Sequence, residues 1–266
     1  LPLLHASKKF FPQYIAELKG YAKSAGINFF EFWTISLEDE LDWIEHCTSV
    51  ITNRGRIIAH NEDFDRGTEN SLCLLKKTIG DLTIFELFYY NTLGGNSASI
   101  NSHGVIQLVN TLKQTDRQIG VPKNIIGRWM SESRDPKADF QKLKKIKRSS
   151  GYNFIYVKNN FGIINIECTA KKQLLSVPTL PYVPTNHYVT KLKKYERYKG
   201  VSSYERYAFA KKHTKKNMDI KNAMNLMNDS TLGFDESVMN ENTIGKMVFD
   251  LEKNDMYVWL LREATK

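Results

Sequence analysis

Residues 45–63 read EHCTSVITNRGRIIAHNED, and this stretch decides how the rest of the chain is interpreted. Cys47 stands where a helical pattern gives way to short β-like runs. Thr48 to Thr52 and Arg56 to His60 flank Asn53-Arg54-Gly55, whose Asn and Gly suit the backbone angles of a tight turn. The pattern therefore predicts a β-hairpin with Cys47 at its open end.

Helices are expected before this hairpin and, in pairs, after it. Apolar residues recur with a 3.6-residue period from Phe11 to Ala25, and Gly26 follows where a C-cap glycine belongs. A second helix is predicted from Phe29 to Leu41. Proline and the apolar spacing predict four more helices, over Pro122–Ser133, Pro136–Arg148, Ser202–Lys212 and Asp219–Met227.

Strands are expected in groups between these helices. Groups of strands alternating with pairs of helices, rather than with single crossover helices, favour an α+β fold with largely antiparallel sheets. Beyond the hairpin, the predicted strands are Leu72–Lys77, Thr83–Tyr90, Val105–Asn110, Tyr152–Lys158, Phe161–Glu167 across an Asn159-Asn160 turn, Thr243–Leu251 and Met256–Leu261.

Composition excludes several classes of protein. A 266-residue chain with 41% hydrophobic residues can bury the core of one large domain or two small ones. The longest apolar runs, such as Leu82 to Tyr90, fall well short of the roughly 20 residues of a membrane span.

Gly94-Gly95 lacks the spacing of a phosphate-binding loop. Cys47, Cys73 and Cys168 are too few for a disulfide scaffold, and the last two alternate with apolar residues as core positions do.

A net charge of +9 raises the possibility of an anionic partner. The densest basic run, Lys142 to Arg148, has helical spacing and is interpreted as a solvated helix face. A second basic stretch, Lys191 to Lys216, carries several tyrosines and is the best support for nucleic-acid or anionic-surface binding. Such binding would weaken steeply with salt and survive the loss of Cys47.

Taken alone, Cys47 has two interpretations. A cysteine is more often a small buried hydrophobe than a nucleophile, although His46 beside it could lower the pKa of its thiol. A papain-like enzyme, with Cys47 paired to His103 or His187, is one way to use a reactive thiol here.

Read together, Cys47-Thr48-Ser49, the hairpin and His60-Asn61-Glu62-Asp63 resemble the N-terminal-nucleophile (Ntn) cysteine hydrolases. The similarity is strongest to the acyl-CoA:6-aminopenicillanic acid acyltransferases and related β-alanyl-amine hydrolases (peptidase C45-like), and more distant to bile-salt and penicillin V hydrolases. Further blocks recur in order along the chain: the leader up to Tyr21, Gly104–Leu112, Asn153–Glu167 with Thr169, Thr185–Tyr188, Ser203–Arg206 and the strand from Thr243.

The resemblance implies a four-layer αββα sandwich and a precursor that cuts itself before the cysteine, here at the His46-Cys47 bond. Residues 1–46 would be a helical leader, removed or retained as a small chain, and residues 47–266 the catalytic domain. The freed α-amino group, with a pKa near 7.7 to 8.0, could act as base for its own thiol, which an amide nitrogen cannot.

The resemblance also assigns site residues, each with a simpler alternative. Asp63 would orient the amino end of Cys47, or be a turn carboxylate. Asn110 and Asn186 would stabilise the oxyanion, or end a strand and a turn. Arg206 would support the nucleophile, or form a helix-surface ion pair. His60 would contact substrate where the bile-salt branch carries arginine, or act as a structural donor.

The sequence thus predicts a self-processing amidohydrolase or acyltransferase acting on a small acyl-amide or acyl-CoA substrate. We expect no cofactor, no metal ion, no nucleic-acid partner and no membrane span. The chain opens with Leu1 where family members carry more residues, which predicts a truncated N-terminus. The compartment stays undecided, with the cytoplasm preferred, and oligomeric state and substrate identity stay open.

Overall fold

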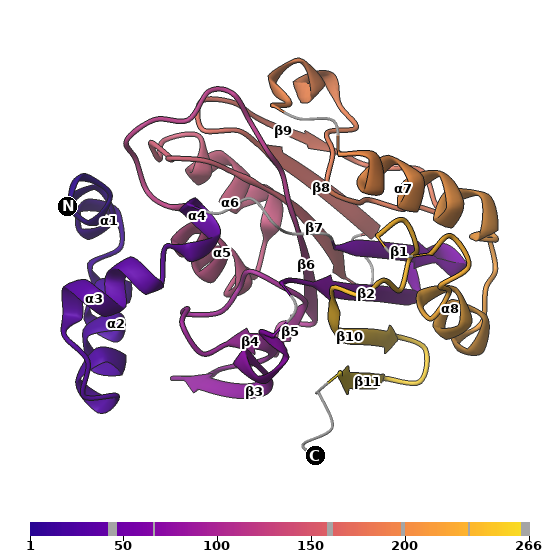
Figure 1. Cartoon of the computed structure of the whole chain (residues 1–266), viewed down its shortest axis with the longest axis horizontal. Helices are drawn as coiled ribbons and strands as arrows, with labels where there is room; N and C mark the ends of the chain where they lie inside the picture. The colour runs from indigo at the N-terminus through magenta and orange to yellow at the C-terminus, as the bar shows by residue number, and fades with distance from the viewer. Residues whose placement is uncertain (42–46, 66, 159–161, 198–199, 234, 262–266) are drawn as a thin grey trace.

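The computed structural model consists of two antiparallel β-sheets stacked face to face, with helices on both outer sides (Figure 1). It describes residues 1–41, 47–65, 67–158, 162–197, 200–233 and 235–261. The layers run helix, sheet, sheet, helix, and each of three large apolar clusters fills one space between neighbouring layers. The α+β class and the four-layer sandwich are therefore confirmed.

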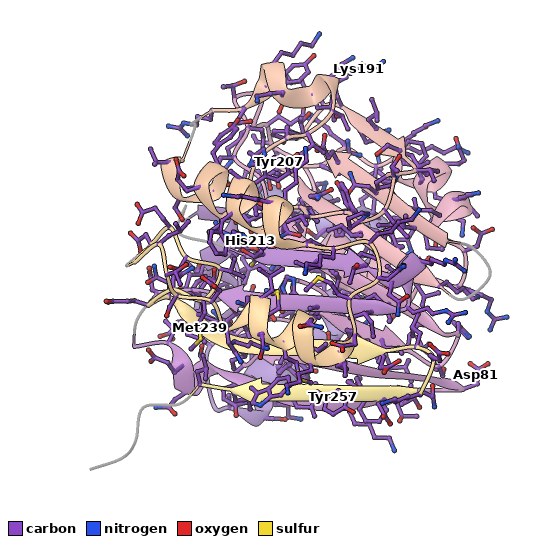
Figure 2. All side chains as sticks on the ribbon, turned by 90° about the vertical axis from the view of Figure 1, so that its right-hand side faces the viewer. Asp81, Lys191, Tyr207, His213, Met239 and Tyr257 are labelled. Carbon is purple, nitrogen blue, oxygen red and sulfur yellow. The ribbon has the colours of Figure 1, made fainter. Side chains whose placement is uncertain are left out.

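The smaller sheet begins with the predicted hairpin. Its strand order is β1-β2-β10-β11, with β1 at Thr48–Thr52, β2 at Ile57–Asp63, β10 at Thr243–Asp250 and β11 at Asp255–Leu260. The turn between β1 and β2 has positive φ at Asn53, Arg54 and Gly55 (48°, 59° and 85°), as its sequence predicts. Helices α7 (Val201–His213) and α8 (Ile220–Met227) cover the outer face of this sheet (Figure 2).

The larger sheet has seven strands in sequence order from β3 to β9. Helices α5 (Lys123–Ser131) and α6 (Pro136–Leu143) pack on its outer face. Its strands are β3 Leu72–Ile79, β4 Leu82–Tyr89, β5 Ser99–Asn101, β6 Val105–Thr111, β7 Tyr152–Lys158, β8 Gly162–Cys168 and β9 Gln173–Ser176.

The pleat of the β1–β2 hairpin sends alternate side chains to opposite layers. Ile51 and Ile58 point into the core between the two sheets, whereas Val50 and Ala59 belong to the cluster beneath α7 and α8. The two strands pair with Ser49 opposite His60. By this alternation Ser49 and His60 face the larger sheet, and their chain neighbours face the helices.

The described part of the predicted leader forms four helices against the outer face of the larger sheet: α1 Pro2–Phe10, α2 Pro12–Ser24, α3 Phe29–Ile35 and α4 Glu38–Leu41 (Figure 1). Its last helix is tied to the domain by buried charges. Glu40 accepts hydrogen bonds from the Lys123 backbone (3.0 Å) and the Ser150 hydroxyl (2.6 Å), and Asp39 pairs with the Lys123 ammonium at 2.5 Å.

Two predicted helices are shorter than expected. The segment Phe29 to Leu41 breaks at Ser36, whose carbonyl accepts a hydrogen bond from Asn124 (2.6 Å) instead of continuing the helix. The helix from Pro136 ends at Leu143, because Arg148 folds back and donates to the Leu143 carbonyl (2.9 Å). Arg148 is buried, so the interpretation of Lys142–Arg148 as one solvated helix face is wrong.

The remaining predicted elements are confirmed within a few residues, and α1, β5 and β9 were not predicted. Strands β7 and β8 pair as expected, while their Asn159-Asn160 turn lies outside the described residues. In the part of the chain that the structure describes, every helix is too short or too polar to span a bilayer.

Close backbone contact between the β4–β5 loop and α5 makes a testable prediction. A Cβ atom added at Gly127 would lie 2.5 Å from the carbonyl oxygen of Gly95, whereas one added at Gly20 in α2 meets nothing within 4 Å. We expect Gly127→Ala to lower the free energy of unfolding by about 1–3 kcal/mol through overpacking. Gly20→Ala, the matched control, should raise it by about 0.5–1 kcal/mol. Urea unfolding measures both, and equal stabilities would contradict the contact.

Candidate active site

Cys47 lies directly before β1, with its thiol buried between the two sheets. The residue is 3% exposed. Its sulfur lies within 4.8 Å of a ring nitrogen of His60 and a carboxylate oxygen of Glu62. These three side chains come from the open end of the hairpin, where the pleat turns them to the same face.

His60 and Glu62 form a buried hydrogen-bonded chain beside the thiol. His60 Nδ1 lies 2.8 Å from the Ser49 hydroxyl, and His60 Nε2 lies 2.9 Å from Glu62 Oε2. Glu62 also accepts hydrogen bonds from the hydroxyl of Tyr89 on β4 (2.8 Å) and from Ser97 in the β4–β5 loop. The imidazole is therefore held in position from both of its nitrogens.

Asn110 reaches the same space from β6 of the larger sheet. Its Oδ1 accepts a hydrogen bond from the Ser49 hydroxyl at 3.2 Å. Its Nδ2 is buried and has no hydrogen-bond partner among the described residues. A buried amide donor without a partner is costly, so its presence here suits a group that must later meet a ligand oxygen.

Arg206 connects Cys47 to the second predicted asparagine, Asn186. It lies on α7 and is fully buried. Its guanidinium donates to the Cys47 carbonyl (2.8 Å), the Thr48 hydroxyl (2.7 Å) and Asn186 Oδ1 (2.9 Å). Because the oxygen of Asn186 faces Arg206, its NH₂ group points away as a donor, toward the Thr111 carbonyl at 3.2 Å. The surface ion pair weighed for Arg206 is thus not what forms.

Asp63 ends β2 on the side of the sheet that faces α7 and α8. It is fully buried and accepts a hydrogen bond from Asn240 (2.9 Å). Burial raises the pKa of Asp63 to about 6, although the charge of Arg206 and hydrogen bonds from Thr243 and Asn240 act in the opposite direction. Burial likewise lowers the pKa of Arg206, and Asp63 and Cys47 oppose that shift. Asp63 and Arg206 are thus electrostatically coupled beside Cys47.

The donor set of Cys47, His60 and Glu62 is of a kind that can bind zinc. The direct hydrogen bond between His60 and Glu62 already accounts for their approach, and each group has protein partners. No cofactor is implied by this arrangement, and the expected absence of a metal ion stays a prediction.

The sequence matches a known protein family. The model of the acyl-coenzyme A:6-aminopenicillanic acid acyl-transferase family matches residues 50–264, well over half of the chain. The chain belongs to this family. The match begins just after Cys47 and therefore does not include it.

Individual relatives of this acyl-transferase family member are distant. A β-alanyl-dopamine/carcinine hydrolase from Drosophila melanogaster is 25% identical over 166 residues, which cover 53% of this chain and 43% of that protein. The chain thus spans less than half the length of this curated relative.

Two solved structures share the fold. A penicillin V acylase from Agrobacterium tumefaciens superposes with a TM-score of 0.55 at 11% identity, over 80% of this chain and 82% of the acylase. A variant of conjugated bile acid hydrolase from Clostridium perfringens superposes with a TM-score of 0.50 at 10% identity, over 82% of this chain and 93% of the hydrolase. The resemblance to Ntn hydrolases inferred from the sequence is confirmed at the level of family and fold.

The histidines named for a papain-like pair lie in other surroundings. His103 is partly exposed beside Arg134 (3.5 Å). His187 stacks on Tyr204 with ring centroids 4.1 Å apart, and its Nδ1 contacts Ser203 at 2.9 Å. Burial, Lys193 and Arg206 lower the pKa of His187 to about 4. In the described ranges, the histidine grouped with Cys47 is His60.

Some residues of the site could have been predicted from the sequence, and others could not. Ser49 and Glu62 were missed, although strand alternation from Cys47 and His60 would have placed both on one face. Tyr89 and Ser97 come from strand β4 and the β4–β5 loop, and no local signal near Cys47 indicates them. His46, expected at the processing bond, lies outside the described residues, and a substrate contact by His60 stays a prediction.

The buried carboxyl group of Asp63 predicts a specific pH dependence. Its folded pKa of about 6 exceeds the ordinary value of 3.8, so the unfolded chain loses this proton first as the pH rises. The group therefore lowers the free energy of unfolding progressively between about pH 4 and pH 6, by up to about 3 kcal/mol. Asp63→Asn should remove this fall, and thus gain stability relative to wild type between pH 4.5 and pH 7.5.

Urea unfolding at the two pH values tests this expectation. Asp81→Asn is the control, because the Asp81 carboxylate is 91% exposed and should leave the pH dependence unchanged. A wild-type protein that gains stability relative to Asp63→Asn over the same interval would contradict the raised pKa.

Proposed function

We propose that this chain is a self-processing amidohydrolase or acyltransferase that acts on linear C–N amide or thioester bonds through an acyl-Cys47 intermediate. The observation that carries the proposal is the convergence of Cys47, Asn110, Asn186 and Arg206. These residues come from the hairpin, the larger sheet, a loop and α7. Arg206 donates to the Cys47 carbonyl and to Asn186, and Asn110 accepts from the Ser49 hydroxyl of the hairpin. Family membership supports the same class of chemistry.

The proposed catalytic cycle uses the thiol and α-amine of Cys47 and the two asparagines. The freed α-amine of Cys47 takes the proton of its thiol, and the thiolate attacks the substrate carbonyl. The developing oxyanion accepts hydrogen bonds from the amide groups of Asn110 and Asn186. The ammonium returns the proton to the leaving amine, which departs as the C–N bond breaks. Water or a second amine then attacks the thioester, releases the acyl group and returns the thiol.

Substrate chemistry is proposed from the relatives. The family is named for acyl transfer between a coenzyme A thioester and an amine, and the Drosophila relative for hydrolysis of a β-alanyl amide of a small amine. The shared bond joins a small acyl group to sulfur or nitrogen. A cavity of about 170 Å³, lined by Tyr89, Asn96 and residues of the leader, adjoins the Tyr89–Glu62 hydrogen bond and is the candidate for part of the substrate site.

The leader is proposed to stay bound after cleavage. Asp39 and Glu40 are buried against Lys123 and Ser150, and Arg117 also donates to Glu40 at 3.2 Å. Removing residues 1–41 would take two carboxylates away from the buried Lys123 and one away from the Ser150 hydroxyl, which is costly for buried groups. We therefore favour retention as a small chain over release.

Self-cleavage before Cys47 can be tested directly. Full-length protein expressed and purified under folding conditions should yield a polypeptide that starts at Cys47, because the thiol attacks the preceding carbonyl. Cys47→Ala should remain uncut. Cys73→Ala, which alters a partly exposed cysteine on β3, should cut like wild type. Intact-mass spectrometry with N-terminal sequencing distinguishes these results, and an uncut wild-type chain would refute the mechanism.

The oxyanion role proposed for Asn110 and Asn186 can be tested by mutation. With a substrate found by screening acyl-amines and acyl-CoA thioesters, Asn186→Ala and Asn110→Ala should each lower kcat by about 100- to 1000-fold, since each removes an oxyanion donor worth about 3 kcal/mol. KM should change little. Steady-state kinetics on cleaved protein measure both constants, with Asn222→Ala on the exposed start of α8 as control. A change confined to KM would assign these residues to substrate binding instead.

A further inference from the structure

Self-cleavage poses a proton-transfer problem that the freed α-amine does not solve. Before the cut, the nitrogen of Cys47 belongs to a peptide bond and has no basicity. A thiol with an ordinary pKa near 8.5 is mostly protonated at neutral pH, and only the thiolate is strongly nucleophilic. The uncut chain therefore needs another group to accept the thiol proton. This inference rests on the proposed self-cleavage.

We propose that His60, paired with Glu62, is the base that activates the Cys47 thiol in the uncut chain. A ring nitrogen of His60 and an oxygen of Glu62 lie within 4.8 Å of the sulfur. The side chains are buried, with His60 fully excluded from solvent. A short path in a dry site suits transfer of a proton without loss to water.

The hydrogen bonds assign the two ring nitrogens different roles. Glu62 as a carboxylate can only accept, so Nε2 of His60 carries a hydrogen and donates to it at 2.9 Å. Nδ1 is then the basic position, opposite the Ser49 hydroxyl at 2.8 Å. Tyr89 and Ser97 donate to Glu62 and hold the carboxylate in this orientation. This is the arrangement that stabilises an imidazolium.

Ser49 can accommodate either charge state of His60. Its hydroxyl donates to Nδ1 when the imidazole is neutral. When Nδ1 takes up a proton, the hydroxyl accepts from it and turns its own hydrogen to Asn110 Oδ1, which lies 3.2 Å away. Both ring nitrogens of His60 thus have a hydrogen-bond partner in either protonation state, so proton uptake leaves neither of them unsatisfied.

The step balances with the groups named. The proton of the thiol reaches Nδ1 of His60 through the Ser49 hydroxyl, which gives its own hydrogen to Nδ1 and accepts that of the thiol. The thiolate then forms a C–S bond to the carbonyl carbon that precedes Cys47. The imidazolium then gives its proton to the nitrogen of Cys47 as the C–N bond breaks. The products are a thioester and a free α-amine, and water hydrolyses the thioester to a carboxylate and the Cys47 thiol.

In this proposal, self-cleavage and later turnover use the same nucleophile but different bases. His60 and Glu62 serve the single event of maturation, and the α-amine that this event creates serves every later turnover. The papain-like alternative for turnover would instead keep a histidine as base throughout. A variant without His60 should thus lose speed in cleavage far more than in kcat once it is cleaved.

The test uses the full-length chain, denatured in urea and diluted into buffers from pH 5 to 9. Cleavage is followed by intact mass for wild type, His60→Gln, Glu62→Gln and, as control, His103→Gln. At pH 7 we expect His60→Gln to cleave at least 100-fold more slowly than wild type, Glu62→Gln about tenfold more slowly, and the control at the wild-type rate. A wild-type rate in His60→Gln would overturn the proposal.

A second readout separates this proposal from the proposed function. If wild type never cleaves, the self-processing mechanism fails, and alkylation of Cys47 by iodoacetamide in that uncut chain then tests the base alone. Alkylation at pH 7 at least tenfold faster in wild type than in His60→Gln supports the pair, and equal rates overturn it. Cys73 in the same molecule is the internal reference.

The pH profile guards against a merely structural effect. The wild-type cleavage rate should level off above the pH at which His60 is neutral, whereas residual cleavage in His60→Gln should keep rising with hydroxide. Circular dichroism shows whether His60→Gln folds. If it does not, the cleavage rate of Glu62→Gln and the pH profile of the wild-type rate test the proposal instead. A wild-type rate that rises tenfold per pH unit from pH 5 to 9 would overturn the proposal.

Discussion

The buried guanidinium of Arg206 is the interaction on which the rest of the site depends. Removing a cation from water costs several kcal/mol unless its hydrogen bonds are satisfied. Arg206 meets this demand with the Cys47 carbonyl, the Thr48 hydroxyl and Asn186. Since Cys47 and Thr48 lie on one segment and Asn186 on another, satisfying the one cation fixes the backbone at Cys47 and the orientation of the Asn186 amide together.

The pleat of a single hairpin divides the site into a supporting face and a reacting face. Thr48 and Asp63 point to the helices, where Arg206 and Asn240 bind them. Cys47, His60 and Glu62 meet on the opposite face. A register slip of one residue would exchange the two sets, so the site requires the pairing of Thr48 with Asn61 that the tight turn and strand β10 enforce.

Local signals in the sequence were enough for most elements but not for the contacts between layers. The hairpin turn, the helix from Pro12 and the β7–β8 pair follow from neighbouring residues alone. The break at Ser36 depends on Asn124, 88 residues farther along the chain. The early end at Leu143 depends on Arg148, which Thr169 and Gln173 of another segment hold in place. In the same way, family likeness pointed to Arg206 and the two asparagines, while Tyr89 and Ser97 needed the second sheet to be in place.

Self-cleavage, as proposed, creates a positive charge in a buried site, and the fold already contains a group suited to meet it. Asp63 is held at a pKa of about 6, because burial disfavours its charge more than Arg206 favours it. A new ammonium at Cys47 would favour the carboxylate and recover part of that cost. The same field would favour the protonated amine at rest. Cleavage would therefore relieve an electrostatic penalty at Asp63, and the ammonium that Asp63 favours would have to lose its proton before it could act as the base of turnover.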